Sequence, residues 1–374
     1  MARRSNWNFQ VDPFKNEPVC VCLISGAWVP LLVGRPKLKI GIVLDGRASA
    51  SAMADLARLA EKNGIENLWL SAGARTKDHF VRLAVAASST TKIRLGPVAT
   101  SPFEMHPVVI GTALLTLDEA AAGRGCIVVG GGGDLASTLG APLRNRVQAV
   151  EDTLRIIRKL AEGGEVNYEG NMFKVAGLFS PWNLARVPPM FVGANRPRML
   201  ELAAKLADGV MFTDMPGNYV AELVHTVKAL LSRFGRSKDD FQISNWFVWN
   251  VQDNAEEARR LARAALAFRL YYIKDVAGHI GLARSDAVML ERRQPEMVRA
   301  LLRGRPELLQ KALSDLIIDK LTITGDIRGV DRCIERLHEF KKQGLTQIAL
   351  SLEGDPAKGI RTIGQKVVPI FRET

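Results

Sequence analysis

Eight short apolar runs alternate with helical patterns between residue 38 and the carboxyl end of the chain, and this alternation limits the possible folds more than any other feature. Most runs lack an apolar–polar alternation, which is typical of parallel strands buried on both faces. The runs are Leu38–Leu44, Asn67–Ser71, Ile93–Ala99, Cys126–Gly130, Met190–Gly193, Val210–Thr213, Gln242–Trp249 and Gln347–Leu352. The helical patterns are Ala50–Asn63, Asp78–Ser89, Pro107–Ala121, Arg144–Glu162, Pro197–Ala207, Tyr219–Phe234, Ala255–Phe268 and Asp331–Gln343. This regular alternation predicts an α/β protein folded as a (β/α)8 TIM barrel rather than an open sheet.

Three segments lie outside this minimal pattern. We expect residues 1–36 to form an N-terminal extension that packs on the barrel or is partly disordered, and residues 37–374 to form the barrel. A mostly helical, arginine-rich insertion, about residues 271–321, precedes the last strand, and such insertions often form lids or oligomer contacts. The long connection at residues 163–189 contains a segment, residues 169–174, that is typical of a small hairpin.

Composition favours an ordinary globular protein over a membrane or nucleic-acid-binding one. With 374 residues and 47% hydrophobic content, the chain can bury a large core. The apolar segment Val19–Val33 is similar to a signal peptide but is broken by Gly26 and Pro30, and no longer uncharged apolar run occurs. The net charge of +12 is scattered beside acids rather than gathered with aromatic residues. We therefore expect no nucleic-acid partner and no membrane partner.

The cysteines and histidines predict no metal site. Cys20 and Cys22 are separated by a single residue, and no histidine cluster accompanies them. His79 is interpreted as an isolated residue on a helical pattern, and His106 as a residue that orders its loop. The few cysteines are expected to be reduced thiols of a cytoplasmic protein.

The segment Ile93–Asp134 carries the strongest functional signal. A strand-like run breaks at Gly96, a helix opens after His106, and the second strand ends in four glycines, Gly130–Gly133, followed by Asp134. Glycines let a flat ring approach the backbone, and successive free N–H groups bind anionic oxygens. The segment therefore predicts a β-α-β unit that admits a flat, anionic cofactor, with a flexible tight turn as the alternative interpretation of the glycines.

Active sites of TIM barrels lie at the carboxyl ends of the strands, so polar residues at those ends are candidate site residues. Asp134 is a candidate to position substrate or transfer a proton, or else a helix N-cap. Asn195 and Arg196 precede Pro197, which suits a first helical turn, so the amides around them are a candidate site for a phosphate or a ring carbonyl. Capping by Asn195 is the alternative there. Thr213 is a possible polar contact at the end of the sixth strand.

The chain resembles the bacterial-luciferase-like superfamily, and within it the deazaflavin-dependent methylenetetrahydromethanopterin reductases. The resemblance runs from about Lys37 to Phe371 and rests on Ile93–Asp134, on the block VPPMFVGANRPRMLELAAKLADGVMFT and on the tail that begins TGDIRGVDRCIERL. It implies bound coenzyme F420, a homo-oligomer, and a bulged third strand in which a non-proline cis peptide at Val98 and Ala99 supports the deazaflavin ring. The cofactor-binding residues that we predict are Ser71, Val98, Ala99, Thr100, Gly130, Gly131, Gly132, Gly193, Ala194, Asn195, Arg196 and Thr213.

Two strand ends depart from the family pattern. The aspartate–histidine pair expected after the second strand is replaced by Ala72-Gly73, and Val43 stands in place of an early glutamate, with Asp45 two residues further on. The predicted catalytic residues are Asp134, Asn195 and Asp45. The predicted function is F420-dependent hydride transfer to or from a small organic substrate. An FMN-dependent monooxygenase, and a barrel that has lost its site, are the alternatives.

Overall fold

The structure of the chain is a computed structural model that describes residues 7–11, 18–24, 27–31, 37–73, 76–270, 273–303 and 310–372. The chain divides into two compact units, Met1–Lys37 together with Thr374, and Leu38–Glu373. The first unit contains three antiparallel strands that the sequence analysis does not predict. They are ordered β1 (Trp7–Val11), β2 (Pro18–Ile24) and β3 (Ala27–Leu31).

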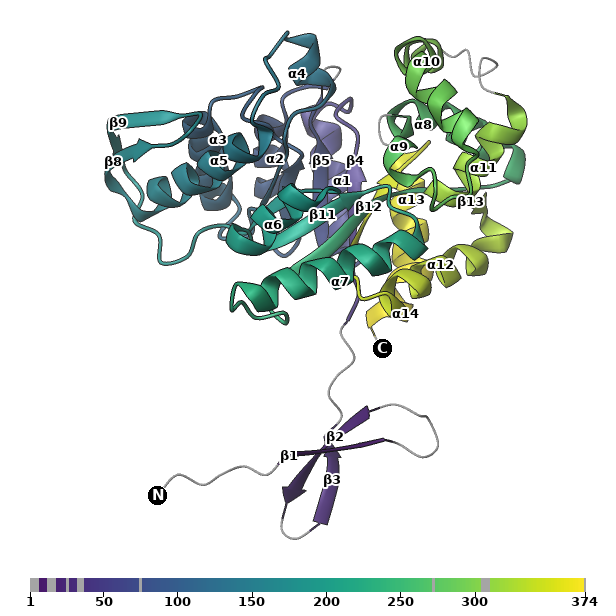
Figure 1. Ribbon diagram of the computed structural model, residues 1–374, viewed down its shortest axis with the longest axis horizontal. Helices are drawn as coiled ribbons and strands as arrows, with labels where there is room; N and C mark the ends of the chain where they lie inside the picture. Colours follow the sequence, from purple (N-terminus) through teal and green to yellow (C-terminus); the bar gives the residue numbers. More distant parts are fainter. Residues whose placement is uncertain are drawn as a thin grey trace. The chain divides into compact units, whose positions relative to one another are not determined.

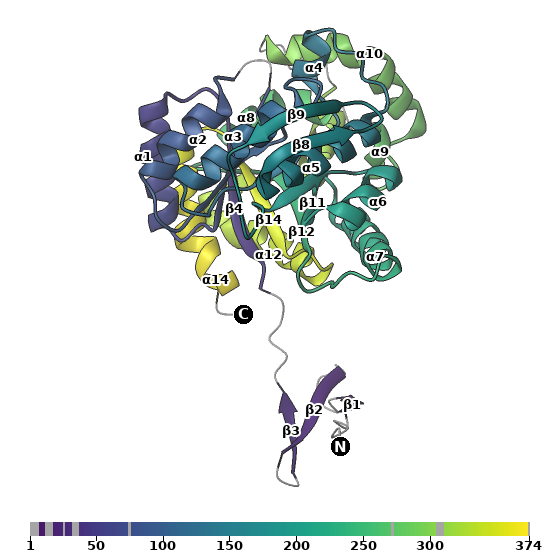
Figure 2. The ribbon, with the colours of Figure 1, turned by 90° about the vertical axis from the view of Figure 1, so that its left-hand side faces the viewer.

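The second unit is a barrel of eight parallel strands in which each strand pairs with its successor along the chain (Figures 1 and 2). The strands are β4 (Lys39–Leu44), β5 (Asn67–Ser71), β6 (Arg94–Val98), β7 (Ile127–Val129), β10 (Met190–Gly193), β11 (Gly209–Thr213), β12 (Gln242–Gln252) and β14 (Gln347–Leu352). Bridges from Leu95 to Gly125 and from Thr100 to Val129 join β6 to β7 and close the barrel. The (β/α)8 TIM barrel predicted from the sequence is therefore confirmed.

Helices surround the barrel. Those of the eight units are α1 (Ala50–Lys62), α2 (His79–Ser88), α3 (Pro107–Ala120), α5 (Arg146–Glu162), α6 (Pro197–Leu206), α7 (Gly217–Arg233), α8 (Ala255–Arg269) and α12 (Val330–Lys342). The others are the short α4 (Asp134–Thr138), the insertion helices α9 (Ile273–Val276), α10 (Arg284–Leu302) and α11 (Lys311–Leu321), and the C-terminal α13 (Pro356–Thr362) and α14 (Val368–Arg372). In both views α4 and α10 lie at the same end of the barrel. Among the described residues, no helix combines the length and the apolar character needed to cross a bilayer.

Local sequence explains where the helices begin. The side chains of Ser49, Asp78 and Asn254 each accept a hydrogen bond from a backbone N–H in the first turn of α1, α2 and α8, which satisfies a group that the helix itself leaves unpaired. His106 has the same role in α3, where its Nδ1 accepts from Val108 N at 3.2 Å. His106 therefore caps the helix that follows its loop, and its role in ordering the loop itself stays a prediction.

The barrel interior is filled by side chains rather than open. Trp69 on β5 is fully buried and meets Phe191 on β10 edge-to-face, with ring centroids 5.5 Å apart. The apolar residues packed with them are Val43, Val98, Cys126, Val128, Met211 and Ala349. These residues belong to β4, β6, β7, β11 and β14 or directly precede β7, so the cluster joins strands around the barrel.

The sequence misses one strand of this unit. β13 (Thr322–Asp326) pairs with the carboxyl half of β12, outside the barrel. This pairing is available because β12 spans 11 residues and extends beyond its barrel neighbours. The hairpin predicted near residues 169–174 is confirmed, since β8 (Gly164–Glu169) and β9 (Lys174–Ser180) are antiparallel.

Candidate functional site

The carboxyl end of β6 holds a cis peptide bond between Val98 and Ala99, neither of which precedes a proline. The cis bond implied by the family resemblance is therefore present. The next residue, Thr100, is buried, and its backbone bonds to β7: Thr100 N donates to Val128 O, and Gly130 N donates to Thr100 O, both at 2.9 Å. Thr100, the residue that follows the cis peptide, and the first glycine after β7 thus form one hydrogen-bonded unit.

The glycines after β7 keep side chains away from this unit. A Cβ on Gly130 would lie 3.1 Å from the Cβ of Ala99, and Gly132 has φ +90, a conformation that other residues rarely adopt. A Cβ on the exposed Gly133 would meet nothing within 4 Å. We call Val98–Thr100 with Gly130–Gly133 the glycine cradle. The glycines leave its backbone free of side chains, and contact of this backbone with a flat ligand stays a prediction.

Two helices begin beside the cradle without a side-chain cap. The N-cap of α5 is Asn145, with φ 48, and the N-cap of α6 is Arg196; neither side chain bonds to its helix. Arg146, the first residue of α5, lies next to Gly131, where an added Cβ would be 3.2 Å from the arginine Cβ. Uncapped N–H groups and a neighbouring guanidinium suit the anionic part of a cofactor.

The predicted residues on β10 and β11 are bound to protein partners. The Asn195 amide accepts from Thr213 N at 3.0 Å and donates to Thr213 O at 3.3 Å, which ties the two strand ends together. Arg196 makes a bidentate ion pair with Asp275 of α9, with N–O distances of 3.1 and 3.2 Å. The backbone N–H of Ala194 is also bonded within the barrel, to Met211 O at 3.0 Å. A direct contact of Asn195 with a ring stays a prediction.

Asp134 and Ser71 keep their predicted places at strand ends. Asp134 is the first residue of α4, with Gly133 rather than Asp134 at the N-cap, and its side chain lies outside the described structure. Ser71 is the last residue of β5 and pairs in register with Val98. The roles of both residues stay predictions.

Asp45 lies just beyond β4 and is bound to Arg47, whose Nε donates to its carboxylate at 2.8 Å. Partial burial disfavours its charged form, but the hydrogen bonds and charge of Arg47 outweigh that cost and hold the pKa of Asp45 below its ordinary value. Asp45 is therefore ionised at neutral pH and is poorly suited to donate a proton.

Two residues of α2 reach this face of the barrel, although the sequence analysis does not select them. His79 lies on a helix and packs against Phe80, as its helical pattern suggests, but its Nε2 also lies 3.4 Å from Thr100 Oγ1 at the end of β6. Burial lowers the pKa of His79, which keeps the ring neutral at pH 7. One turn later, Arg82 is 3% exposed, donates weakly to Asp45 O at 3.5 Å, and has no described partner for Nε and Nη1. The i, i+3 spacing of His79 and Arg82, at the start of the helix that follows β5, is the signal that identifies them.

A second group of charged residues follows β11 and β14. Asp214, with φ 53, forms an ion pair at 3.3 Å with Arg269 of α8, and both side chains are 6% exposed. Burial outweighs the attraction of Arg269 and raises the pKa of Asp214. Glu353 is half-buried, and burial raises its pKa to about 7, assisted by the negative charges of Asp45 and Asp214 and opposed by Arg269. None of these three residues was a candidate in the sequence analysis.

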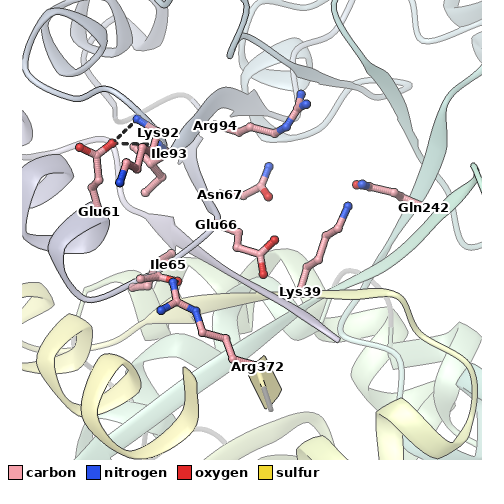
Figure 3. Close-up of a pocket in the computed structure, with 11 residues that line it drawn as sticks. Lys39, Glu61, Ile65, Glu66, Asn67, Lys92, Ile93, Arg94, Gln242 and Arg372 are labelled. Atoms are coloured by element: carbon pink, nitrogen blue, oxygen red, sulfur yellow. Dashed lines mark hydrogen bonds between the residues drawn. The ribbon is translucent and has the colours of Figure 1, made fainter. Parts of the chain in front are cut away.

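A polar cavity of about 240 Å³ lies at the opposite, amino end of the strands (Figure 3). Its lining includes Lys39, Asn67, Arg94 and Gln242, at or beside the first residues of β4, β5, β6 and β12. Because catalytic residues of TIM barrels come from the carboxyl ends of the strands, this cavity is separate from the candidate site. Within the described residues, no group of three or more His, Cys, Asp or Glu side chains is arranged to hold a metal ion.

A closed barrel of parallel strands, with the glycine cradle at its carboxyl face, defines the class of protein as a TIM barrel. The chain belongs to the luciferase-like monooxygenase family, whose model matches residues 38–347. Both the fold and the superfamily predicted from the sequence are therefore confirmed.

Individual relatives are reductases. The chain is 29% identical over 319 residues to 5,10-methylenetetrahydromethanopterin reductase of Archaeoglobus fulgidus, covering 83% of this chain and 93% of that protein. It is 25% identical over 359 residues to the enzyme of the same name from Methanopyrus kandleri, covering 90% and 99%. The solved structure of the coenzyme F420 dependent tetrahydromethanopterin reductase from Methanopyrus kandleri matches with a TM-score of 0.79 at 24% identity, covering 90% of this chain and 99% of that one.

Proposed function

We propose that this protein is a coenzyme F420-dependent oxidoreductase that reduces a one-carbon unit carried between two nitrogens of a pterin. The observation that carries the proposal is the glycine cradle, in which the backbone of Thr100 is hydrogen-bonded to Val128 and Gly130 at the glycine end of β7. Full-length similarity to reductases that act on methylenetetrahydromethanopterin supports the choice of cofactor and substrate class.

The residues of the cradle fit a deazaflavin. Backbone at Val98–Thr100 and Gly130–Gly132 would support one face of the ring, since no Cβ intervenes at the glycines. The uncapped starts of α5 and α6, together with Arg146, would hold the anionic tail of the cofactor. When bound, the cofactor supplies the hydride, and the protein supplies orientation and electrostatics.

The substrate would enter above the ends of β4, β5 and β14. Ser71, Asp45, His79 and Glu353 lie at this side of the carboxyl face. The family's aspartate–histidine pair is absent at Ala72-Gly73, and His79 brings an imidazole to the neighbouring Thr100 instead. We propose a cytoplasmic homo-oligomer, in keeping with the family resemblance.

An FMN-dependent monooxygenase is the second candidate, because the matching family model describes luciferase-like monooxygenases. The two functions differ in their need for oxygen. The test is to follow the absorbance of reduced F420 with 5,10-methylenetetrahydromethanopterin under nitrogen and in air. We expect enzyme-dependent oxidation of reduced F420 at equal rates in both. Turnover with reduced FMN that requires oxygen, and none with F420, would replace this proposal by the monooxygenase.

A further inference from the structure

Glu353 lies at the carboxyl end of β14 in a position fixed by its backbone. Its N–H donates to Trp249 O at 3.3 Å, and its carbonyl accepts from Gln252 Nε2 at 3.0 Å. Both partners belong to β12, so the peptide at Glu353 is anchored to the neighbouring strand. The backbone of Glu353 is therefore fixed to the neighbouring strand at the carboxyl face of the barrel.

The charged groups around Glu353 come from three elements. Arg269 belongs to α8, Asp45 and Arg47 follow β4, and Asp214 follows β11. The β4 and β12 strands flank β14 in the barrel, and β11 is the next strand beyond β12. Glu353 thus lies between an ion pair on one side, Asp45 with Arg47, and a buried ion pair on the other, Asp214 with Arg269.

Of these three carboxyls, Glu353 is the one without a partner. Asp45 accepts from Arg47, and Asp214 accepts from Arg269. The Glu353 carboxyl makes no hydrogen bond or ion pair with any side chain or backbone group in the described ranges. A half-buried carboxyl close to two other carboxyls retains its proton near neutral pH and can then release it. Asp45 and Asp214 are less suited to this role, because each is bound to an arginine.

We propose that Glu353 is the proton donor of the reduction. In a methylene group held between two nitrogens, one C–N bond breaks and its electron pair goes to the nitrogen, which takes the Glu353 proton. The carbon accepts a hydride from the reduced deazaflavin and becomes a methyl group, and the deazaflavin is oxidised by two electrons. Glu353 is left as a carboxylate next to Arg269 and regains its proton from solvent. This inference rests on the proposed function, which it extends by naming the acid.

The role predicts a specific effect of Glu353→Gln, because glutamine keeps the size of the side chain and cannot donate a proton in this way. We expect kcat with reduced F420 and 5,10-methylenetetrahydromethanopterin to fall roughly 10²–10⁴-fold, as is usual when a general acid is lost. We expect the Kd for F420 to stay unchanged. Wild-type kcat should fall as the pH rises through about 7, where Glu353 deprotonates, and the variant should lose this dependence.

A second measurement does not depend on turnover. Infrared difference spectra of the free protein between pH 5 and pH 9 should contain a protonated-carboxyl band that titrates near pH 7 in wild type. That band should be absent from Glu353→Gln and retained in Glu335→Gln, a matched control at an exposed position on α12. Glu353→Asp, which shortens the side chain but keeps the acid, should recover part of the rate.

The outcomes separate the two proposals. Normal kcat and pH dependence in Glu353→Gln would overturn the role of Glu353 while leaving the proposed function in place. A wild-type protein that binds no F420, or does not turn over this pair, would overturn the proposed function and this role with it. Loss of activity in Glu353→Gln without the infrared titration near pH 7 would show that the residue is structural.

Discussion

His79 Nε2 lies 3.4 Å from Oγ1 of Thr100, the residue that follows the cis peptide. A side chain from the first turn of α2 is thus in contact with the end of β6, at the place where the cradle begins. His79 positions Thr100, whose backbone is shared between β6 and the glycine end of β7.

Replacing His79 by alanine should therefore weaken the cradle rather than the fold. We expect the Kd for F420 to rise roughly two- to tenfold, which is the size of effect that one hydrogen bond produces. Fluorescence titration of F420 measures this change. His225→Ala, at an exposed position on α7, is the control and should leave the Kd unchanged. Equal affinities of His79→Ala and wild type would show that the contact is incidental.

Removing one partner of the buried ion pair between Asp214 and Arg269 should lower the stability of the protein markedly. Arg269→Met leaves Asp214 without its partner, and we expect the free energy of unfolding to fall by about 3–5 kcal/mol at pH 8. The loss should be smaller at pH 5, because Asp214 already has a raised pKa and becomes neutral there more readily.

Urea denaturation of a small set of variants measures this prediction. The double variant Arg269→Met/Asp214→Asn should recover most of the stability, since no unpaired buried charge remains. Arg233→Met removes an exposed ion pair with Glu201 and should cost less than about 1 kcal/mol. Additive losses in the double variant would contradict this account of the pair.

Glu353 should make the protein less stable as the pH rises, the opposite of the usual effect of a carboxyl group. Its pKa is raised to about 7 in the folded chain from an ordinary value of 4.5, so the folded state binds the proton more strongly than the unfolded state. Stability is therefore gained from this group below pH 4.5 and is lost as the pH rises through 7.

The Glu353→Gln variant does not lose stability in this way as the pH rises, because glutamine does not ionise. The Tm of the variant relative to wild type should consequently be higher at pH 8 than at pH 4, as measured by thermal unfolding at both values. The Tm of the control Glu335→Gln should differ from that of wild type by the same amount at both pH values. A pH-independent difference for Glu353→Gln would mean that its carboxyl is already ionised in the folded protein.

Sequence alone predicts the barrel because the signal is local. Runs such as Asn67–Ser71 and Met190–Gly193 are apolar without alternation, and the structure reproduces these bounds. The site is only partly predictable, because several of its contacts join residues that are far apart in the sequence. The cradle lies within one continuous segment, whereas Asp214 and Arg269 are 55 residues apart and meet only after folding.

The strand-end argument applies to Glu353 as well. Glu353 directly follows Leu352, the last residue of β14, so the same reasoning that selects Asp134 applies to it. Its raised pKa, however, depends on the neighbours that β4, β11 and α8 supply, and no pattern in the sequence encodes those contacts. The missed β13 likewise depends on the unusual length of β12.

The most direct test of the account is a binding titration of the purified protein with F420 and, separately, with FMN, in wild type and two glycine variants. Gly130→Val should clash with Ala99 in the cradle, whereas Gly278→Ala adds a methyl group where nothing lies within 4 Å. We predict saturable binding of F420 to wild type and to Gly278→Ala, loss of at least tenfold in affinity in Gly130→Val, and much weaker binding of FMN. Binding of F420 that is unaffected by Gly130→Val, or no binding of F420 at all, would contradict the placement of the cofactor in the glycine cradle.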